Sequence, residues 1–166
     1  MENLKEYRIR FGCECCIKCK GKVLMQEKSQ KSGFYPGYLS FPGGHMEYGE
    51  DPFKTIIREI KEETGINLIE KNLNLIADVF HYRKKEKLLW NIYIFEVELY
   101  DFPPTCASNE GEVKWITKQE LKSNPQIVPP MKYYTEYALN HKDKLCMMSI
   151  ELKNDKLTKV LSQKYI

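Results

Sequence analysis

The chain has no long apolar run. Its longest largely apolar stretch, residues 88–95, is much shorter than the roughly 20 residues that a membrane-spanning helix needs. The N-terminal segment, MENLKEYRIR, is charged and lacks the apolar core of a secretory signal peptide. We therefore expect a soluble, cytoplasmic protein that has no membrane partner.

A strong excess of one charge and an internal repeat are also absent. The 166 residues include 26 Lys and Arg against 23 Asp and Glu, which gives a formal net charge of +3. Dedicated nucleic-acid binders usually present a much more basic face, so we do not expect nucleic acid as the partner. A polyanionic small molecule suits this balance equally well. The length and the lack of repeats indicate one domain.

Histidine is scarce, and the three histidines are isolated, so they support no metal-ligand set. The six cysteines are expected to be reduced in the cytosol. The two-residue gap between Cys16 and Cys19 suits a tetrahedral zinc site, but no second Cys or His pair has the usual spacing. Alternation along a β-strand would divide the cysteines of segment 13–19 between two faces, so packing is the favoured interpretation.

The order of the predicted elements indicates an α/β or α+β layered fold. Segments rich in alternating or β-forming side chains are predicted strands; they are residues 7–19, 23–25, 38–41, 73–81, 88–99 and 113–116. Helical segments are expected at 118–122 and 130–140. We expect a single domain over 1–166, with a core at about 7–140 and a C-terminal β-hairpin extension at about 144–162 that would allow a homodimer.

The clearest helix signal begins at Pro52. Apolar or small side chains recur there every three or four residues, as on the buried face of an amphipathic helix; they are Phe53, Ile56, Ile57, Ile60 and Thr64. Asp51 can cap the N-terminus, Pro52 suits the first turn, and Gly65 can adopt the left-handed conformation that ends a helix.

Three carboxylates share one strip of this helix. Glu59, Glu62 and Glu63 fall within an arc of roughly 100° beside the apolar face. Like charges at these spacings are unfavourable by a few tenths of a kcal/mol, about the cost that a compensating cation would offset. One interpretation is a solvated acidic face paired with lysines; the other is a site for Mg²⁺, or Mn²⁺ as a substitute. The preceding turn, Gly43-Gly44, lets backbone approach a ligand closely.

Residues 44–66, GHMEYGEDPFKTIIREIKEETGI, resemble the Nudix box. Its pattern is Gly, five residues, Glu, seven residues, Arg-Glu-apolar, one residue, Glu-Glu, one residue, Gly-apolar. Every fixed position is met: Gly44, Glu50, Arg58, Glu59, Ile60, Glu62, Glu63, Gly65 and Ile66. A looser resemblance runs from about Tyr7 to about Asn140. The resemblance implies a Nudix-type α/β/α sandwich in which a central mixed β-sheet lies between helices.

The resemblance also implies a divalent-metal-dependent hydrolase that cuts a phosphoanhydride bond in a nucleoside diphosphate derivative. Its implied metal ligands are Glu59, Glu62, Glu63 and the carbonyl of Gly43. Glu50 and Arg58 would brace the loop through an ion pair. The base that activates water would be Glu59 in the box, or a further carboxylate from Glu110 or Glu112, of which Glu110 is slightly favoured.

The substrate is less clearly indicated. Phe34, Tyr35 and Tyr38 could stack on a nucleobase or could pack within the loop and strand, and the backbone at Gly44 could approach the substrate. Tyr82 lies close to where dinucleoside-polyphosphate hydrolases of the family carry a tyrosine. ADP-ribose-cleaving members often have a proline at the position that His81 occupies here.

A free nucleotide, such as a nucleoside triphosphate or its oxidised form, is the favoured small-molecule substrate. The alternatives within enzymes are ADP-ribose or another sugar nucleotide, a dinucleoside polyphosphate, and the 5′ end of an RNA. From a different class, the chain could sense a nucleotide without cutting it. The intact set of box carboxylates argues against this last function, because a binding module would not need them.

Overall fold

The computed structural model describes residues 3–32, 35–140, 143–154 and 156–166. Its strands are β1 (Arg8–Cys19), β2 (Lys22–Lys28), β3 (Leu39–Ser40), β4 (Asn74–Arg83), β5 (Leu88–Leu99), β6 (Gly111–Thr117), β7 (Cys146–Lys153) and β8 (Lys156–Tyr165). Its α-helices are α1 (Pro52–Thr64), α2 (Lys118–Ser123) and α3 (Lys132–Asn140), and short 3₁₀ turns occur at η1 (Leu4–Glu6), η2 (Glu70–Asn72) and η3 (Pro129–Met131).

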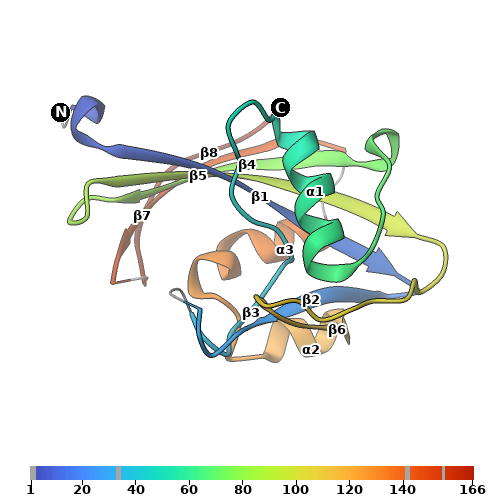
Figure 1. Ribbon diagram of the computed structural model, residues 1–166. Coiled ribbons are helices and arrows are strands. Elements are labelled where there is room, and N and C mark those ends of the chain that lie inside the picture. The colour runs from blue at the N-terminus through green and yellow to red at the C-terminus, as the bar shows by residue number, and fades with distance from the viewer. Residues whose placement is uncertain (1–2, 33–34, 141–142, 155) are drawn as a thin grey trace.

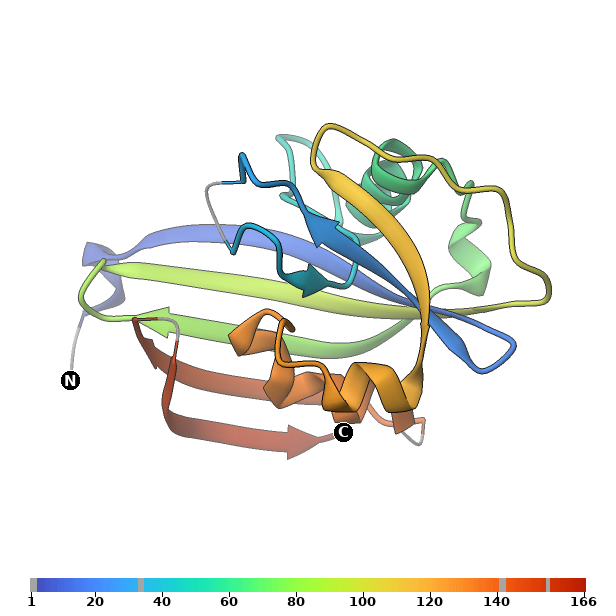
Figure 2. The ribbon, with the colours of Figure 1, turned by 90° about the horizontal axis from the view of Figure 1, so that it is seen from below.

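The strands form one mixed sheet in the order β3-β2-β1-β5-β4-β7-β8, and β6 pairs with β2. The β1–β5 and β4–β7 pairs are parallel, and the other pairs are antiparallel. β1 and β2 pair only beside their connecting turn, at Lys18↔Val23 and Cys19↔Lys22. Beyond that turn the two strands diverge (Figure 2), and the opening between them is where the site lies.

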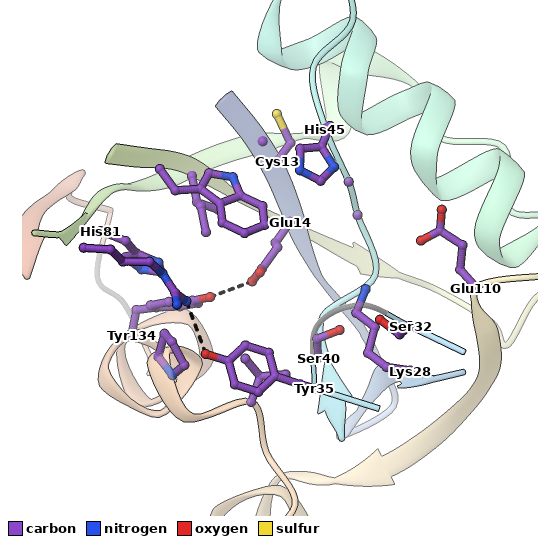
Figure 3. A pocket seen from close by; sticks show the side chains of 18 residues that line it. Cys13, Glu14, Lys28, Ser32, Tyr35, Ser40, His45, His81, Glu110 and Tyr134 are labelled. Atoms are coloured by element: carbon purple, nitrogen blue, oxygen red, sulfur yellow. Dashed lines mark hydrogen bonds between the residues drawn. The ribbon is translucent and has the colours of Figure 1, made fainter. Parts of the chain in front are cut away.

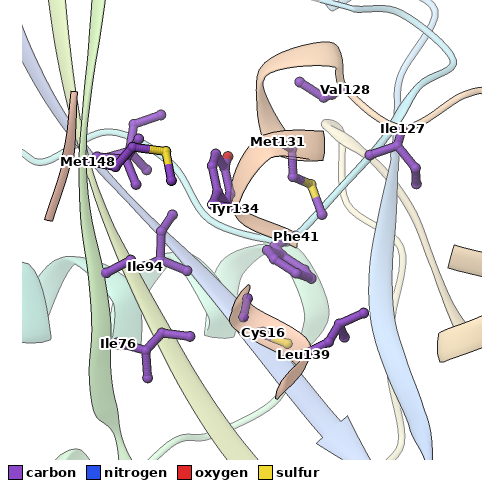
Figure 4. Packing of buried hydrophobic residues seen from close by; sticks show 14 of the residues in the cluster. Cys16, Phe41, Ile76, Ile94, Ile127, Val128, Met131, Tyr134, Leu139 and Met148 are labelled. Atoms are coloured by element: carbon purple, nitrogen blue, oxygen red, sulfur yellow. The ribbon is translucent and has the colours of Figure 1, made fainter. Parts of the chain in front are cut away.

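Helices cover both faces of the sheet (Figure 1). α1 packs on one face, where its Ile56 and Ile60 join a cluster that includes Phe95. α2 and α3 pack on the other face, in the cluster drawn in Figure 4, which includes Tyr134 and Leu139. The fold is therefore the α/β/α sandwich with a central mixed sheet that the sequence predicts.

The cysteines of β1 are divided between the two faces. Cys13 and Cys15 pack with α1, whereas Cys16 packs in the cluster beneath α3. All three are buried, which is the packing role favoured from the alternation of the strand.

α1 begins and ends where the sequence predicts. The Asp51 side chain accepts a hydrogen bond from the backbone N–H of Lys54 at 3.0 Å, and Pro52 lies in the first turn. Gly65 ends the helix in the left-handed conformation, with φ of 76°. These limits fix which turn of the helix presents its glutamates to the sheet.

The C-terminal segment extends the central sheet. β7 pairs in parallel with β4, and β8 pairs with β7 at the sheet edge, in the segment for which the sequence predicts a hairpin. Of the helices in the described parts of the chain, none is long and apolar enough to cross a membrane.

Candidate active site

The loop before α1 takes the place of a strand beside β1. Three backbone hydrogen bonds hold it there: Cys13 N–H to the Gly44 carbonyl at 2.9 Å, Cys15 N–H to the Pro42 carbonyl at 3.0 Å, and Met46 N–H to the Phe11 carbonyl at 3.0 Å. The loop therefore enters the opening that β1 and β2 leave between them. This brings the start of the box against the centre of the sheet.

Two glycines make this close approach feasible. Gly43 has φ of 145°, and a Cβ there would lie 2.1 Å from the Cys13 carbonyl oxygen. A Cβ on Gly44 would lie 2.5 Å from the carboxylate of Glu59. Gly43 has no room for a side chain, because its φ is positive and the neighbouring atoms belong to the β1 backbone, whereas a side chain at Gly44 would have to displace the Glu59 carboxylate.

Arg58 fixes the loop from the helix side. Its Nε and Nη2 donate to Glu50 Oε1 and Oε2 at 2.7 and 3.0 Å, a two-pronged grip. Nη2 also donates to the His45 carbonyl at 3.0 Å. The Arg58 guanidinium holds the pKa of Glu50 down, at about 2, with help from the backbone N–H of Glu47 and the Thr55 hydroxyl. The ion pair that the resemblance implies is present, and it closes the loop between residues 45 and 50.

The glutamates implied as metal ligands differ in exposure. Glu59 and Glu63 are buried, whereas the Glu62 side chain is 61% exposed. Arg58 Nη1 lies 3.0 Å from Glu59 Oε1 and 3.2 Å from Glu62 Oε2. Within the described residues no three Asp, Glu, His or Cys side chains converge as a ready-made metal cage. The positive charge that accompanies Glu59 and Glu62 in the structure is the guanidinium of Arg58.

Glu63 reaches from α1 to the loop. Its Oε2 accepts a hydrogen bond from the Gly43 N–H at 2.6 Å. Oε1 is buried and meets no hydrogen-bond geometry in the described parts of the chain, although the Gln26 side chain is near enough to lower the pKa of this carboxyl. Burial raises the pKa of Glu63, and it also raises that of Glu59, against the opposing charge of Arg58. The charge of Glu110 adds to both shifts, so these three carboxylates share one electrostatic environment.

A pocket of about 170 Å³ opens beside this loop (Figure 3). At one end it is lined by Gly43 and Gly44, together with Lys28 and Glu110. The other end is formed by side chains of β1, β4, β5 and the η3–α3 region; these include Glu14, His81, Arg83, Trp90 and Tyr134. One cavity thus connects the box to a chamber on the α3 side of the sheet in which aromatic rings lie beside Glu14 and Arg83, called the aromatic chamber below.

Burial strongly shifts the pKa values of two side chains in this chamber, Glu14 and His81. Tyr134 donates a hydrogen bond from its hydroxyl to Glu14 Oε2 at 2.8 Å. Burial raises the pKa of Glu14 to about 7, although Tyr134 and Lys28 oppose the shift. His81 is buried, and burial together with the charge of Arg83 lowers its pKa to about 3. The imidazole is therefore neutral near neutral pH.

The structure brings only some of the expected substrate-contacting residues to the pocket. Tyr35 and Gly44 line it, whereas Tyr38 packs against the core with its ring 6.0 Å from that of Tyr35. Phe34 lies outside the described residues. Tyr82 does not line the pocket, because it alternates along β4 with His81 and Arg83, whose side chains do.

Glu110 and Glu112 are also separated. Glu110 lines the pocket, whereas Glu112 is exposed in β6, opposite Glu27 of β2. Glu110, which the sequence slightly favours as the base, is therefore the one of the two that lines the pocket, and its role stays a prediction. The position just before the strand, rather than within it, is what turns its side chain toward the box.

Sequence reasoning missed most of the chamber. Glu14 was detectable in principle, because it is a single charged residue within the otherwise apolar run CECCI of a predicted central strand. His81 and Arg83 flank the tyrosine that was singled out. Tyr134 gives no local signal, since a tyrosine in an amphipathic helix usually belongs to the core.

Comparisons with known proteins agree with this geometry. A family model described as NUDIX domain matches residues 6–138. The uncharacterized Nudix hydrolase YvcI of Bacillus subtilis is 29% identical over 116 residues, covering 67% of this chain and 68% of that protein. The crystal structure of a MutT protein from Bacillus halodurans has a TM-score of 0.75 at 24% identity and covers 94% of this chain and 97% of its own.

A second solved structure has the same fold. It is a bifunctional NMN adenylyltransferase/ADP ribose pyrophosphatase from Francisella tularensis, complexed with AMP and a manganese ion. Its TM-score is 0.58 at 19% identity, and the match covers 80% of this chain and 42% of that one.

The Arg58–Glu50 grip yields a stability prediction. Replacing Glu50 with Gln removes the charge while keeping the shape, so the free energy of unfolding at pH 7 should fall by about 1–3 kcal/mol. The folded pKa of Glu50 lies below its ordinary value of 4.5, so its stabilising effect is complete above that value and is lost as the pH falls toward about 2. Urea unfolding of both proteins at pH 7, 5 and 4 should therefore show a difference that begins to shrink only in the most acidic sample. A constant difference across these and lower pH values would contradict the assignment.

Proposed function

The chain belongs to the Nudix family and is a pyrophosphohydrolase, and we propose that it cuts a phosphoanhydride bond in a nucleoside diphosphate derivative. A nucleoside triphosphate or an oxidised nucleotide is the favoured substrate. The observation that carries this proposal is the pocket, which connects the box loop at one end to an aromatic chamber at the other. A nucleotide matches both ends. Its anionic phosphates suit the end at the box loop, and its flat base can stack on the aromatic rings of the chamber.

The carboxylates of α1 suit a hard divalent cation such as Mg²⁺, with Mn²⁺ as a substitute. Glu63 Oε1 is buried without a partner among the described residues, and Gly44 keeps the space beside the Glu59 carboxylate free of a side chain. We assign Glu59, Glu62 and Glu63 as ligands, with the Gly43 carbonyl as a further one. When bound, the ion supplies charge neutralisation for the bridging and leaving oxygens. The Francisella tularensis protein of the same fold is complexed with AMP and a manganese ion, which supports the choice of a divalent cation and a nucleotide.

The substrate phosphates belong at the loop end of the pocket. Lys28 lines this end, and its Nζ donates to Gln26 Oε1 at 2.9 Å, which orients the ammonium group. An ammonium here can pair with a phosphate oxygen. The base of the nucleotide then extends toward the aromatic chamber, which α3 closes on its far side.

A carboxylate is needed to accept the proton of the attacking water. The oxygen of that water forms a new bond to phosphorus as the bridging phosphorus–oxygen bond breaks. Glu59 is already engaged by Arg58 Nη1 at 3.0 Å and is assigned to the metal. Glu110 lines the pocket and influences both Glu59 and Glu63 electrostatically. We therefore assign Glu110 as the general base.

The metal assignment predicts the effect of a single neutralising substitution. Wild-type protein should release phosphate or pyrophosphate from nucleoside triphosphates with Mg²⁺, and a chelator should abolish the release. Glu63→Gln should lower turnover by about 100-fold or more, because it removes a ligand charge and weakens the contact to Gly43. Glu98→Gln, an exposed change in β5, is the matched control and should retain wild-type turnover.

A near-normal rate for Glu63→Gln, with a native circular dichroism spectrum, would refute the ligand assignment. Tight nucleotide binding by the wild-type protein without metal-dependent release would instead identify a sensor.

The base assignment predicts a contrast between two neighbouring glutamates. Glu110→Gln should lower kcat by about 100-fold, within the 10²–10⁴ range of general-base catalysis, with a small effect on KM. Glu112→Gln should change kcat less than twofold, roughly the effect of an exposed substitution away from the pocket. Steady-state kinetics of both variants on one nucleotide measure the contrast. If the two variants lose activity equally, Glu110 is not the base.

A further inference from the structure

The aromatic chamber of the pocket contains a carboxylate that the proposed chemistry does not use. Glu14 comes from the middle of β1, and its carboxylate points into the pocket between Tyr134 on one side and Lys28 on the other (Figure 3). Tyr134 donates a single hydrogen bond to Oε2 at 2.8 Å. Burial raises the pKa of Glu14 to about 7, so above that pH the carboxylate form predominates. An ionised carboxylate has about four acceptor positions, so most of its capacity is left for a ligand.

Two further residues that line the pocket each have a buried polar atom without a hydrogen-bond partner among the described residues. The Nε2 of His81 and the Oγ of Ser40 are buried and have no hydrogen-bond partner in the part of the chain that is described. Their residues are 2% and 4% exposed. Buried polar atoms in native proteins almost always find partners, because leaving one unpaired is costly in free energy. Together with Glu14, these atoms indicate that the chamber receives a ligand with a polar edge.

The chamber also offers flat surfaces. The rings of His45 and Trp90 stack with centroids 5.1 Å apart, and those of His81 and Tyr134 lie 6.2 Å apart at an interplanar angle of 29°. All four side chains line the pocket. Aromatic and histidine side chains commonly stack on nucleobases. A flat ligand with a polar edge, attached to phosphates that reach the box loop, is a nucleotide whose base lies at Glu14.

A carboxylate offers only hydrogen-bond acceptors, so it can distinguish among the nucleobases by the donors on their edges. Guanine presents two adjacent N–H donors, N1–H and the 2-amino group, which match the two oxygens of one carboxylate. Adenine and cytosine each place a ring acceptor beside the amino donor, and uracil has one N–H between two carbonyls. Only the guanine edge satisfies both oxygens without setting an acceptor against a carboxylate.

We propose that Glu14 is a specificity-determining residue that selects a guanine nucleotide by accepting the N1–H and 2-amino hydrogens of the base. Tyr134 is a positioning residue, because its hydrogen bond holds the carboxylate toward the chamber. The proposal rests on the proposed function and names the base of its substrate.

The test is a change of base preference in Glu14→Gln. An amide has one acceptor and one donor, so it fits the adenine edge and opposes the guanine edge. With Mg²⁺, wild-type protein should show a higher kcat/KM for GTP than for ATP. In Glu14→Gln the ratio of these values should fall by about 10- to 100-fold, the discrimination of one good bidentate contact. Because both substrates are measured on one preparation, partial misfolding does not alter the ratio.

Two further variants separate recognition from a structural role. Glu14→Asp keeps the carboxylate on a shorter side chain and should retain a preference for GTP at reduced kcat/KM. Glu98→Gln should leave the ratio unchanged. Equal losses for GTP and ATP in Glu14→Gln, or a wild-type preference for another base, would overturn the proposal.

Binding measurements keep this inference distinct from the hydrolase proposal. Calorimetry with non-hydrolysable analogues of GTP and ATP should give the same reversal of preference as the kinetics. If the reversal occurs in binding while no nucleotide is hydrolysed, the guanine assignment stands and the hydrolase proposal fails. If hydrolysis is metal-dependent but the GTP to ATP ratio is the same in wild type and Glu14→Gln, the guanine assignment alone fails.

Discussion

The site depends on how closely the Gly43-Gly44 segment approaches its two neighbours. On one side it replaces a strand beside β1, and on the other it contacts the glutamates of α1. A side chain at Gly43 would overlap the Cys13 carbonyl, so the loop can lie this close to β1 only with glycine there, and a side chain at Gly44 would displace the Glu59 carboxylate from its place beside the loop. The hydrogen bond from Gly43 N–H to Glu63 then ties the loop to the helix. The pocket lies beside this loop, and residues of both β1 and β2 line it.

The same arrangement brings carboxyl groups together in a buried environment that opposes their ionisation. Burial raises the pKa of Glu59 and Glu63, and Glu110 adds to both shifts. Arg58 serves a different purpose, because its two-pronged contact with Glu50 and its hydrogen bond to the His45 carbonyl hold the loop closed, although it also pairs with Glu59. Arg58 of α1 and Glu50 of the preceding loop therefore stabilise the loop, while the buried glutamates of α1 are the proposed ligands of a cation.

Much of this could be predicted from the sequence. The helix limits followed from Asp51, Pro52 and Gly65 because capping is local, and the strands followed from alternation. The chamber could not be predicted, because Glu14, His81 and Tyr134 are distant in sequence and meet only through tertiary packing. Tyr82 shows the limit clearly: adjacent residues of a strand face opposite sides, and β4 has a register shift between Leu75 and Ala77 that no sequence pattern marks.

The most direct test is to incubate wild-type protein with a nucleoside triphosphate and Mg²⁺ in oxygen-labelled water and to analyse the reaction products by mass spectrometry. The account predicts cleavage at a phosphoanhydride bond that stops when the metal is chelated, with one labelled oxygen in a phosphate-containing product. Cleavage that continues without the metal, or label incorporated into the sugar or the base, would contradict it.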